Sequence, residues 1–316
     1  MKTAAILRLT LALQVGAGAL VAALAGPREA ARWAPWVCGA SIPVLLTGLS
    51  IGLQLAIDAA KDPRRPRTSM RHVMQVWIGE CAASLACFCW LQPFRAGYPE
   101  PAAVRDASRP AVLLIHGYAC NRGAWLPLVA SQRLAAFNVA TLDLEPMLAD
   151  IDGYATAIHE AIGRLRAKCD APRVTLVCHS MGGLAARAYL RAYGDAQVDR
   201  LITIATPHRG TIFARLGRGP NAKQMIFGSD WIAQLQSAMT PAWLGRQVHI
   251  GSLDDNLIHP RSSLALPGVA RVHWLDGVGH LAMLTDERVW NLVADEVAAQ
   301  RHPDSSAPDA IAAGRG

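Results

Sequence analysis

The spacing of apolar residues divides the chain into two parts. Up to Leu91 these residues form long, nearly uncharged stretches, and from Pro110 onward short β-rich runs alternate with amphipathic stretches of helical period. Long apolar stretches are typical of membrane segments, whereas alternating strands and helices predict a mostly parallel sheet covered on both faces. We therefore predict a membrane region at 1–60, a basic loop with a third apolar segment and a linker at 61–109, and an α/β domain at 110–301.

Two stretches of the membrane region are long enough to cross a bilayer. Residues 9–25 follow Lys2 and Arg8, and residues 33–57 carry no charge; about 20 apolar residues suffice for a crossing. The first stretch also ends in a small-x-small pattern of the kind that signal peptidase reads, so a cleaved signal peptide is the alternative to a first membrane helix. We favour two membrane helices.

The basic run at 61–71 follows the second stretch directly, which indicates the cytoplasmic side of a membrane. A third apolar stretch, 73–91, is interrupted by Glu80, and its uncharged part is short for a crossing. We therefore expect this stretch to lie in the interface or to dock on the α/β domain. The domain is then cytoplasmic, on the inner membrane of a bacterium; a third crossing would place it in the periplasm.

The α/β domain contains six β-rich runs and three clear helical stretches. The runs predict strands at 111–115, 138–144, 174–177, 198–205, 247–253 and 271–275. The helical periods predict helices at 152–168, 184–193 and 286–301. Residues 302–316 are small and polar, which predicts a disordered tail.

The most informative segment begins at Arg173 and reads Arg-Val-Thr-Leu-Val-Cys-His-Ser-Met-Gly-Gly. It places Ser180 in a sharp turn between a buried strand and a helix opened by two glycines. Such a turn exposes the hydroxyl at the end of a sheet and is the nucleophile elbow of serine hydrolases, with Cys178 in place of the usual first glycine. The alternative is an ordinary serine that caps a helix.

A nucleophilic serine needs a base, an acid that orients the base, and donors for the oxyanion. The last strand is followed by two glycines and then His280, whose position in the chain order suits the base. Asp254 and Asp255 both follow the preceding strand and are candidates for the acid. His116 precedes the elbow, so we expect it to support its own loop.

Five motifs together resemble the α/β-hydrolases of the bacterial lipase and esterase kind, minimal lipases in particular. They are His116-Gly117, the elbow, Thr206-Pro207-His208-Arg209-Gly210-Thr211, Asp255-Asn-Leu-Ile and Gly277-Val-Gly-His280. The resemblance covers about residues 110–300 and implies an α/β-hydrolase fold. It also implies that Ser180 is the nucleophile, His280 the base and Asp255 the orienting acid. Tyr118 and Met181 would supply the backbone N–H groups of the oxyanion hole.

Residues 208–246 form a longer insertion than minimal lipases have between these strands. Asp230 is suited to cap a short helix in which Trp231 and Leu235 share one face. We interpret the insertion as a small cap whose Trp231 and Leu235 contact an acyl group in a substrate pocket. Extra core packing is the alternative.

Composition narrows the possible partners. The chain is 52% hydrophobic and 17% charged, with a formal net charge of +7, but no basic-aromatic interleaving or nucleic-acid motif accompanies that charge. A membrane surface is therefore the expected partner, not nucleic acid. The seven cysteines show neither a paired framework nor metal-ligand spacing. We expect no metal and no organic cofactor.

These observations predict a membrane-anchored serine hydrolase that cleaves carboxylic esters, with a lipid or acyl ester as substrate. A thioesterase or an acyltransferase would use the same three residues with a different substrate or acceptor. A membrane scaffold that keeps the fold without catalysis is the alternative of another class, and the complete set of three residues argues against it.

Overall fold

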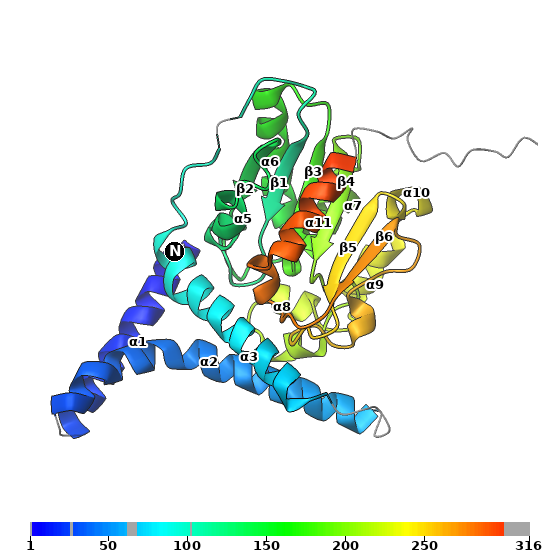
Figure 1. Cartoon of the computed structure of the whole chain (residues 1–316). Coiled ribbons are helices and arrows are strands. Elements are labelled where there is room, and N and C mark those ends of the chain that lie inside the picture. The colour runs from blue at the N-terminus through cyan, green and yellow to red at the C-terminus, as the bar shows by residue number, and fades with distance from the viewer. Residues whose placement is uncertain (1, 26–27, 62–67, 102, 300–316) are drawn as a thin grey trace, which may run out of the picture.

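Three long N-terminal helices lie against one edge of an α/β domain (Figure 1). The computed structural model describes residues 2–25, 28–61, 68–101 and 103–299. The tail predicted to be disordered, 302–316, lies outside the described residues.

A parallel sheet of six strands forms the centre of the α/β domain, in the order β2-β1-β3-β4-β5-β6. The strands are β1 (Ala111–Ile115), β2 (Asn138–Leu142), β3 (Val174–His179), β4 (Val198–Ile204), β5 (Gln247–Ser252) and β6 (Arg271–Leu275). They are the six that the sequence predicts, with small shifts at their ends. Because all six are parallel, their carboxyl ends meet at one edge, where ligands bind in open α/β sheets.

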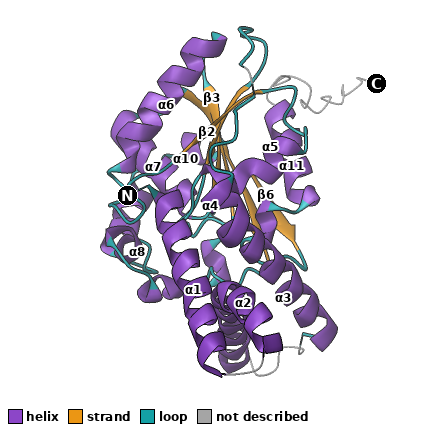
Figure 2. Cartoon of the chain, turned by 90° about the vertical axis from the view of Figure 1, so that its left-hand side faces the viewer, coloured by secondary structure: helices purple, strands orange, loops and turns teal. Residues whose placement is uncertain are grey.

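Helices connect the strands and cover the sheet. The longer helices of the domain are α6 (Tyr154–Cys169), α7 (Met181–Tyr193), α9 (Asp230–Ser237) and α11 (Glu287–Ala298). Shorter turns of helix are α4 (Gln92–Phe94), η2 (Arg122–Trp125), α5 (Leu126–Ala130), η3 (Ile212–Leu216), α8 (Pro220–Gln224), α10 (Pro241–Leu244), η4 (Arg261–Ser263) and η5 (Ala282–Leu284). Figure 2 shows α6 and α7 to one side of the strands, and α5 and α11 to the other.

The alternation of side chains along each strand produces two separate cores. Leu113 and Ile115 of β1 pack with α6 and α7, while Val112 and Leu114 face the core that α5 and α11 complete. Successive side chains of a strand point to opposite faces, so both faces must be apolar when helices cover both. The fold is thus the predicted α/β-hydrolase architecture.

Three helices precede the domain, α1 (Thr3–Ala25), α2 (Arg28–Lys61) and α3 (Met70–Leu85), and a π-helical turn, η1 (Ala86–Leu91), extends α3. By length and composition, each has a stretch that could cross a membrane, at Thr3–Leu24, Trp33–Asp58 and Met70–Phe94. The third stretch is longer than the sequence indicated, since the helix continues on both sides of Glu80. Length therefore does not set α3 apart from α1 and α2.

Burial does distinguish α3. Its side chains at Val76, Cys81 and Ala83 are buried, and the Glu80 carboxylate is 1% exposed. That carboxylate accepts hydrogen bonds from the backbone N–H groups of Leu281 (2.9 Å) and Ala282 (2.8 Å). The charge that interrupts the apolar stretch thus faces the α/β domain.

The insertion 208–246 contains η3, α8, α9 and α10. Asp230 is the first residue of α9 and not its cap, contrary to the prediction: the Ser229 side chain accepts a hydrogen bond from the Ile232 N–H and caps the helix. The short side chain of Ser229 is well suited to accept this hydrogen bond. Asp230 then lies in the first turn of α9, where its negative charge interacts favourably with the positive end of the helix dipole.

Candidate active site

Ser180 stands at the carboxyl end of β3, in the turn that leads into α7. Its backbone angles, φ 54° and ψ −126°, are unusual for a residue with a side chain and cost on the order of 1–3 kcal/mol. The Ser180 N–H donates to the Ile204 carbonyl (2.8 Å), and the Thr206 hydroxyl donates to the Ser180 carbonyl (2.9 Å). The end of β4 therefore holds the strained turn on both sides.

The two glycines after Ser180 allow the turn to approach its neighbours. A Cβ at Gly182 would lie 2.6 Å from the Ile115 carbonyl oxygen, and a Cβ at Gly183 would lie 2.3 Å from the Thr206 hydroxyl oxygen. Both distances are too short for any side chain. The glycines thus let α7 begin directly against the ends of β1 and β4.

Cys178 occupies the position where the elbow usually has its first glycine. Its side chain is fully buried in the core on the α6 and α7 side, opposite Ile115 of β1 and Thr203 of β4. The departure from the usual pattern is therefore accommodated within the sheet, and β3 and α7 remain packed.

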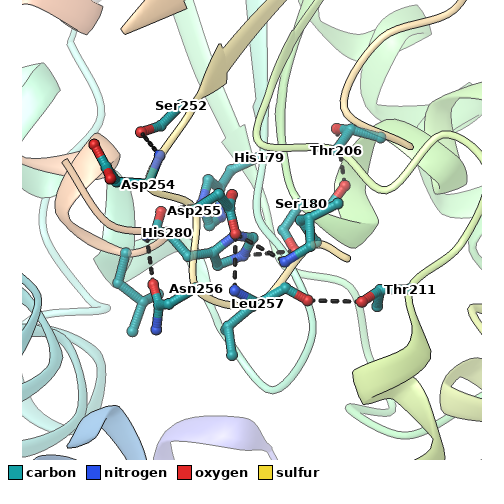
Figure 3. A network of polar contacts seen from close by, with 12 residues as sticks. His179, Ser180, Thr206, Thr211, Ser252, Asp254, Asp255, Asn256, Leu257 and His280 are labelled. Carbon is teal, nitrogen blue, oxygen red and sulfur yellow. Dashed lines mark hydrogen bonds and ion pairs between the residues drawn. The ribbon is translucent and has the colours of Figure 1, made fainter. Parts of the chain in front are cut away.

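Ser180, His280 and Asp255 form one chain of hydrogen bonds (Figure 3). The Ser180 Oγ lies 3.0 Å from Nε2 of His280, and Nδ1 of His280 lies 2.8 Å from Oδ2 of Asp255. All three side chains are buried, and they come from the loops after three different strands. Serine hydrolases hold their nucleophile, base and orienting acid in a chain of hydrogen bonds of this kind.

The geometry separates the two candidate acids. Besides His280, Asp255 is held by the backbone N–H groups of Leu257 (2.9 Å) and Ile258 (2.8 Å), which both donate to its Oδ1. Asp254 points away from His280 and accepts a hydrogen bond from the Gly277 N–H (2.7 Å). Of the two, only Asp255 contacts the imidazole.

Charge around the imidazole makes His280 a stronger base. Burial opposes a charged ring, but the negative charge of Asp255 and its hydrogen bond outweigh that effect, and the charge of Glu80 adds to them. As a result the pKa of His280 is raised above its ordinary value. The ring thus has increased affinity for the proton that Ser180 would give up.

Two residues that the sequence did not indicate fix the loop of His280. Asn256 Oδ1 accepts from the His280 N–H (3.0 Å), and Glu80 accepts from the next two N–H groups along the chain. A Cβ at Gly279 would lie 2.5 Å from Oε2 of Glu80, so the contact requires glycine there. The lone carboxylate within an apolar stretch was the available signal, since such charges are rarely without a partner.

Two other histidines support the site without reaching the Ser180 hydroxyl. His116 accepts the Leu144 N–H at Nε2 (2.9 Å), and its Nδ1 faces the Gly117 carbonyl (2.9 Å). Burial lowers the pKa of His116, which keeps the ring neutral. His179 turns its Nε2 to the carbonyl of His280 (3.1 Å).

The backbone N–H groups of Tyr118 and Met181 are the predicted oxyanion donors. Met181 is the first residue of α7, and N–H groups in the first turn of a helix have no partner within it. Tyr118 follows Gly117, at which a Cβ would lie only 2.8 Å from the Ser180 Cβ. The loop after β1 therefore passes directly against Ser180.

A cavity of about 530 Å³ opens beside Ser180 and His280. This volume falls within the range of roughly 300–1,000 Å³ typical of small-molecule sites. Its walls come from α1, α2, α3 with η1, the loop after β1, the insertion and the loop after β5. From the insertion, Phe213, Leu216 and Met225 reach it.

Trp231 and Leu235 do not have the position predicted for them. Leu235 is fully buried in the core beside α7, and the Trp231 indole donates to Oδ2 of Asp152 (2.9 Å). Among the described residues that line the cavity, neither is present. Helix α9 packs the face that carries Trp231 and Leu235 onto α7. This face therefore adds to the core, which agrees with the alternative interpretation of the insertion as extra core packing.

In the described ranges, no group of three His, Cys, Asp or Glu side chains converges in a way that could hold a metal ion.

Residues 112–292 match the Alpha/beta hydrolase family.

Two solved lipases share the fold. Lipase B of Aspergillus fumigatus matches with a TM-score of 0.54 and 18% identity, over 63% of this chain and 55% of that lipase. The mature form of the Bacillus licheniformis lipase BlEst2 matches with a TM-score of 0.52 and 16% identity, over 62% of this chain and 95% of that lipase. The chain thus spans about half the length of the Aspergillus lipase. At these identities the likeness concerns the fold.

Proposed function

The chain belongs to the Alpha/beta hydrolase family, and we propose that it is a membrane-anchored serine hydrolase that cleaves carboxylic esters of lipids. The observation that carries the proposal is the chain of hydrogen bonds from Asp255 through His280 to Ser180, beside a largely apolar cavity that Ser180 and His280 help to line. The fold that the chain shares with two lipases is consistent with it.

In the first step, Oγ of Ser180 attacks the ester carbonyl, and its proton passes to Nε2 of His280. Asp255 holds the ring in the required tautomer and stabilises the imidazolium that forms. The carbonyl oxygen becomes an oxyanion, which the N–H groups of Tyr118 and Met181 bind. A single donor of this kind contributes on the order of 10²- to 10³-fold to turnover.

The oxyanion then collapses, the bond to the alcohol oxygen breaks, and His280 returns its proton to that oxygen. The alcohol leaves, and the acyl group stays on Ser180 as an ester. Water repeats the sequence: His280 takes its proton, the hydroxide attacks the acyl carbonyl, and the proton returns to Ser180 as the carboxylic acid departs.

We also propose that α1 and α2 anchor the chain in the membrane as a hairpin with both ends on the cytoplasmic side, and that α3 docks on the α/β domain, which is then cytoplasmic. The buried contact of Glu80 with the loop of His280 supports docking of α3. The basic run at 61–71 supports the inside orientation. A fluorescent protein fused after Gly316 is then bright, and alkaline phosphatase fused there is inactive; the reverse pattern would contradict this orientation.

Substitution of Ser180 tests the reaction. Ser180→Ala removes one oxygen and should abolish both hydrolysis of nitrophenyl butyrate and labelling by a fluorophosphonate probe. The unchanged melting temperature of the variant serves as the control for folding. Hydrolysis that persists at more than about a tenth of the original rate contradicts the proposal, since loss of such a nucleophile costs many orders of magnitude.

A further inference from the structure

The N-terminal helices form a large part of the cavity wall, together with the insertion and the loops of the α/β domain. Among the large apolar side chains that they contribute are Leu7, Leu11, Leu46, Leu49, Leu53 and Phe88. These residues belong to the first half of α1, the second half of α2, and η1. Segments far from Ser180 in the sequence therefore complete its cavity.

Polar contacts fix α2 against the α/β domain beside this cavity. Asn256 Nδ2 donates to the Ser50 hydroxyl (2.7 Å), and Arg261 forms an ion pair with Asp58 (2.8 Å). The same Asn256 accepts the N–H of His280, so one side chain joins α2 to the base. The wall is thus held in a defined position relative to Ser180.

The other ends of α1 and α2 extend away from the domain, to the lower left in Figure 1. Large apolar side chains are exposed there, at Leu20, Leu24, Trp33, Trp36 and Val37. An exposed apolar surface of this kind is typical of lipid contact. The hairpin of α1 and α2 therefore has a lipid-facing part and, at its end nearest the domain, a part that faces Ser180.

The cavity suits a hydrocarbon chain and not a phosphate group. Of the described residues that line it, Glu80 is the only Asp, Glu, Lys or Arg, and its carboxylate is taken up by two backbone N–H groups. No lysine or arginine in that lining could pair with a lipid phosphate. The acyl part of an ester, in contrast, has only apolar surface to bury.

We propose that the domain-proximal halves of α1 and α2 form the acyl-chain site, so that the substrate is an ester with a long aliphatic acyl chain drawn from the surrounding lipid. This inference rests on the proposed function, because Ser180 must be the group that attacks. Each methylene buried against the wall raises kcat/KM by up to about fourfold, the factor that corresponds to about 0.8 kcal/mol.

Two adjacent leucines of α2 provide a matched test. Leu46 lines the cavity and is 59% exposed, while Leu45 is 68% exposed and is not among the lining residues. The full chain in phospholipid nanodiscs would be assayed with nitrophenyl butyrate and nitrophenyl dodecanoate. Leu46→Trp narrows the site and should lower kcat/KM for dodecanoate about tenfold or more, with butyrate much less affected. Leu45→Trp should leave both values near those of the wild type.

Three outcomes would overturn the proposal: equal losses on both esters in Leu46→Trp, no loss on either, or the same selective loss in Leu45→Trp. Leu49→Trp, at another lining position in the second half of α2, should repeat the result of Leu46→Trp and serves if that variant does not fold. Failure of the underlying function is seen separately, as butyrate hydrolysis that survives Ser180→Ala in the wild-type background.

Discussion

Exchange of each of the two adjacent aspartates tests the proposed roles most sharply. In Asp255→Asn, the amide oxygen can still accept from the N–H groups of Leu257 and Ile258, as Oδ1 does now. The amide NH₂ then faces Nδ1 of His280, which must become an acceptor. The ring proton moves to Nε2, next to Ser180, and His280 can no longer take the serine proton. We expect kcat to fall on the order of 10⁴-fold, as for the wrong tautomer in other serine hydrolases.

Asp254→Asn is the control, since the amide oxygen can still accept the Gly277 N–H and the site keeps its tautomer. We expect kcat to stay within about threefold of the wild type, as for substitutions away from a functional contact. The assay is turnover of nitrophenyl butyrate, with the melting temperature of each variant measured alongside. Equal losses in the two variants, or a larger loss in Asp254→Asn, would refute the assignment of Asp255.

Two further predictions follow from the contacts of the site and the insertion. Glu80→Gln removes a negative charge that raises the pKa of His280, although burial raises the pKa of Glu80 itself. The variant also turns an amide NH₂ toward the N–H of Leu281 or Ala282, so its melting temperature should fall. Since His280 must be unprotonated to act, the acidic limb of kcat/KM should move to lower pH, and an unmoved limb would show that Glu80 carries no charge that reaches the base. Leu235→Ala should lower the free energy of unfolding, measured by thermal unfolding, by about 2–5 kcal/mol. The ratio of dodecanoate to butyrate hydrolysis should stay the same; a changed ratio would mean that Leu235 contacts the acyl group after all.

The sheet and the elbow could be predicted because their signals are local. Each strand is a short apolar run, and Ser180 is followed by glycines that the structure requires for contact with β1 and β4. His280 could be placed from the order of motifs along the chain. The choice of Asp255 over Asp254 needed the family resemblance. The two residues are adjacent and chemically identical, so the sequence alone does not show which of their side chains points toward His280.

Contacts between distant segments that no motif marks could not be predicted. Glu80 lies 201 residues from Leu281, and along the sequence its charge bears on membrane crossing but gives no sign that it binds backbone N–H groups. The apolar residues of α1 and α2 are suited equally to lipid, a core or a cavity wall. The same ambiguity applies to Trp231 and Leu235. The sequence indicates that their helix face is buried, but not whether it packs against the core or against a substrate.

Peptide mapping by mass spectrometry tests directly whether Ser180 forms the covalent intermediate. The full chain would be treated with a fluorophosphonate until hydrolysis stops, then digested and sequenced. We expect one phosphonyl group per chain on the peptide that contains Ser180, and none after prior denaturation. A label on another residue, or hydrolysis lost without any label on Ser180, would contradict it.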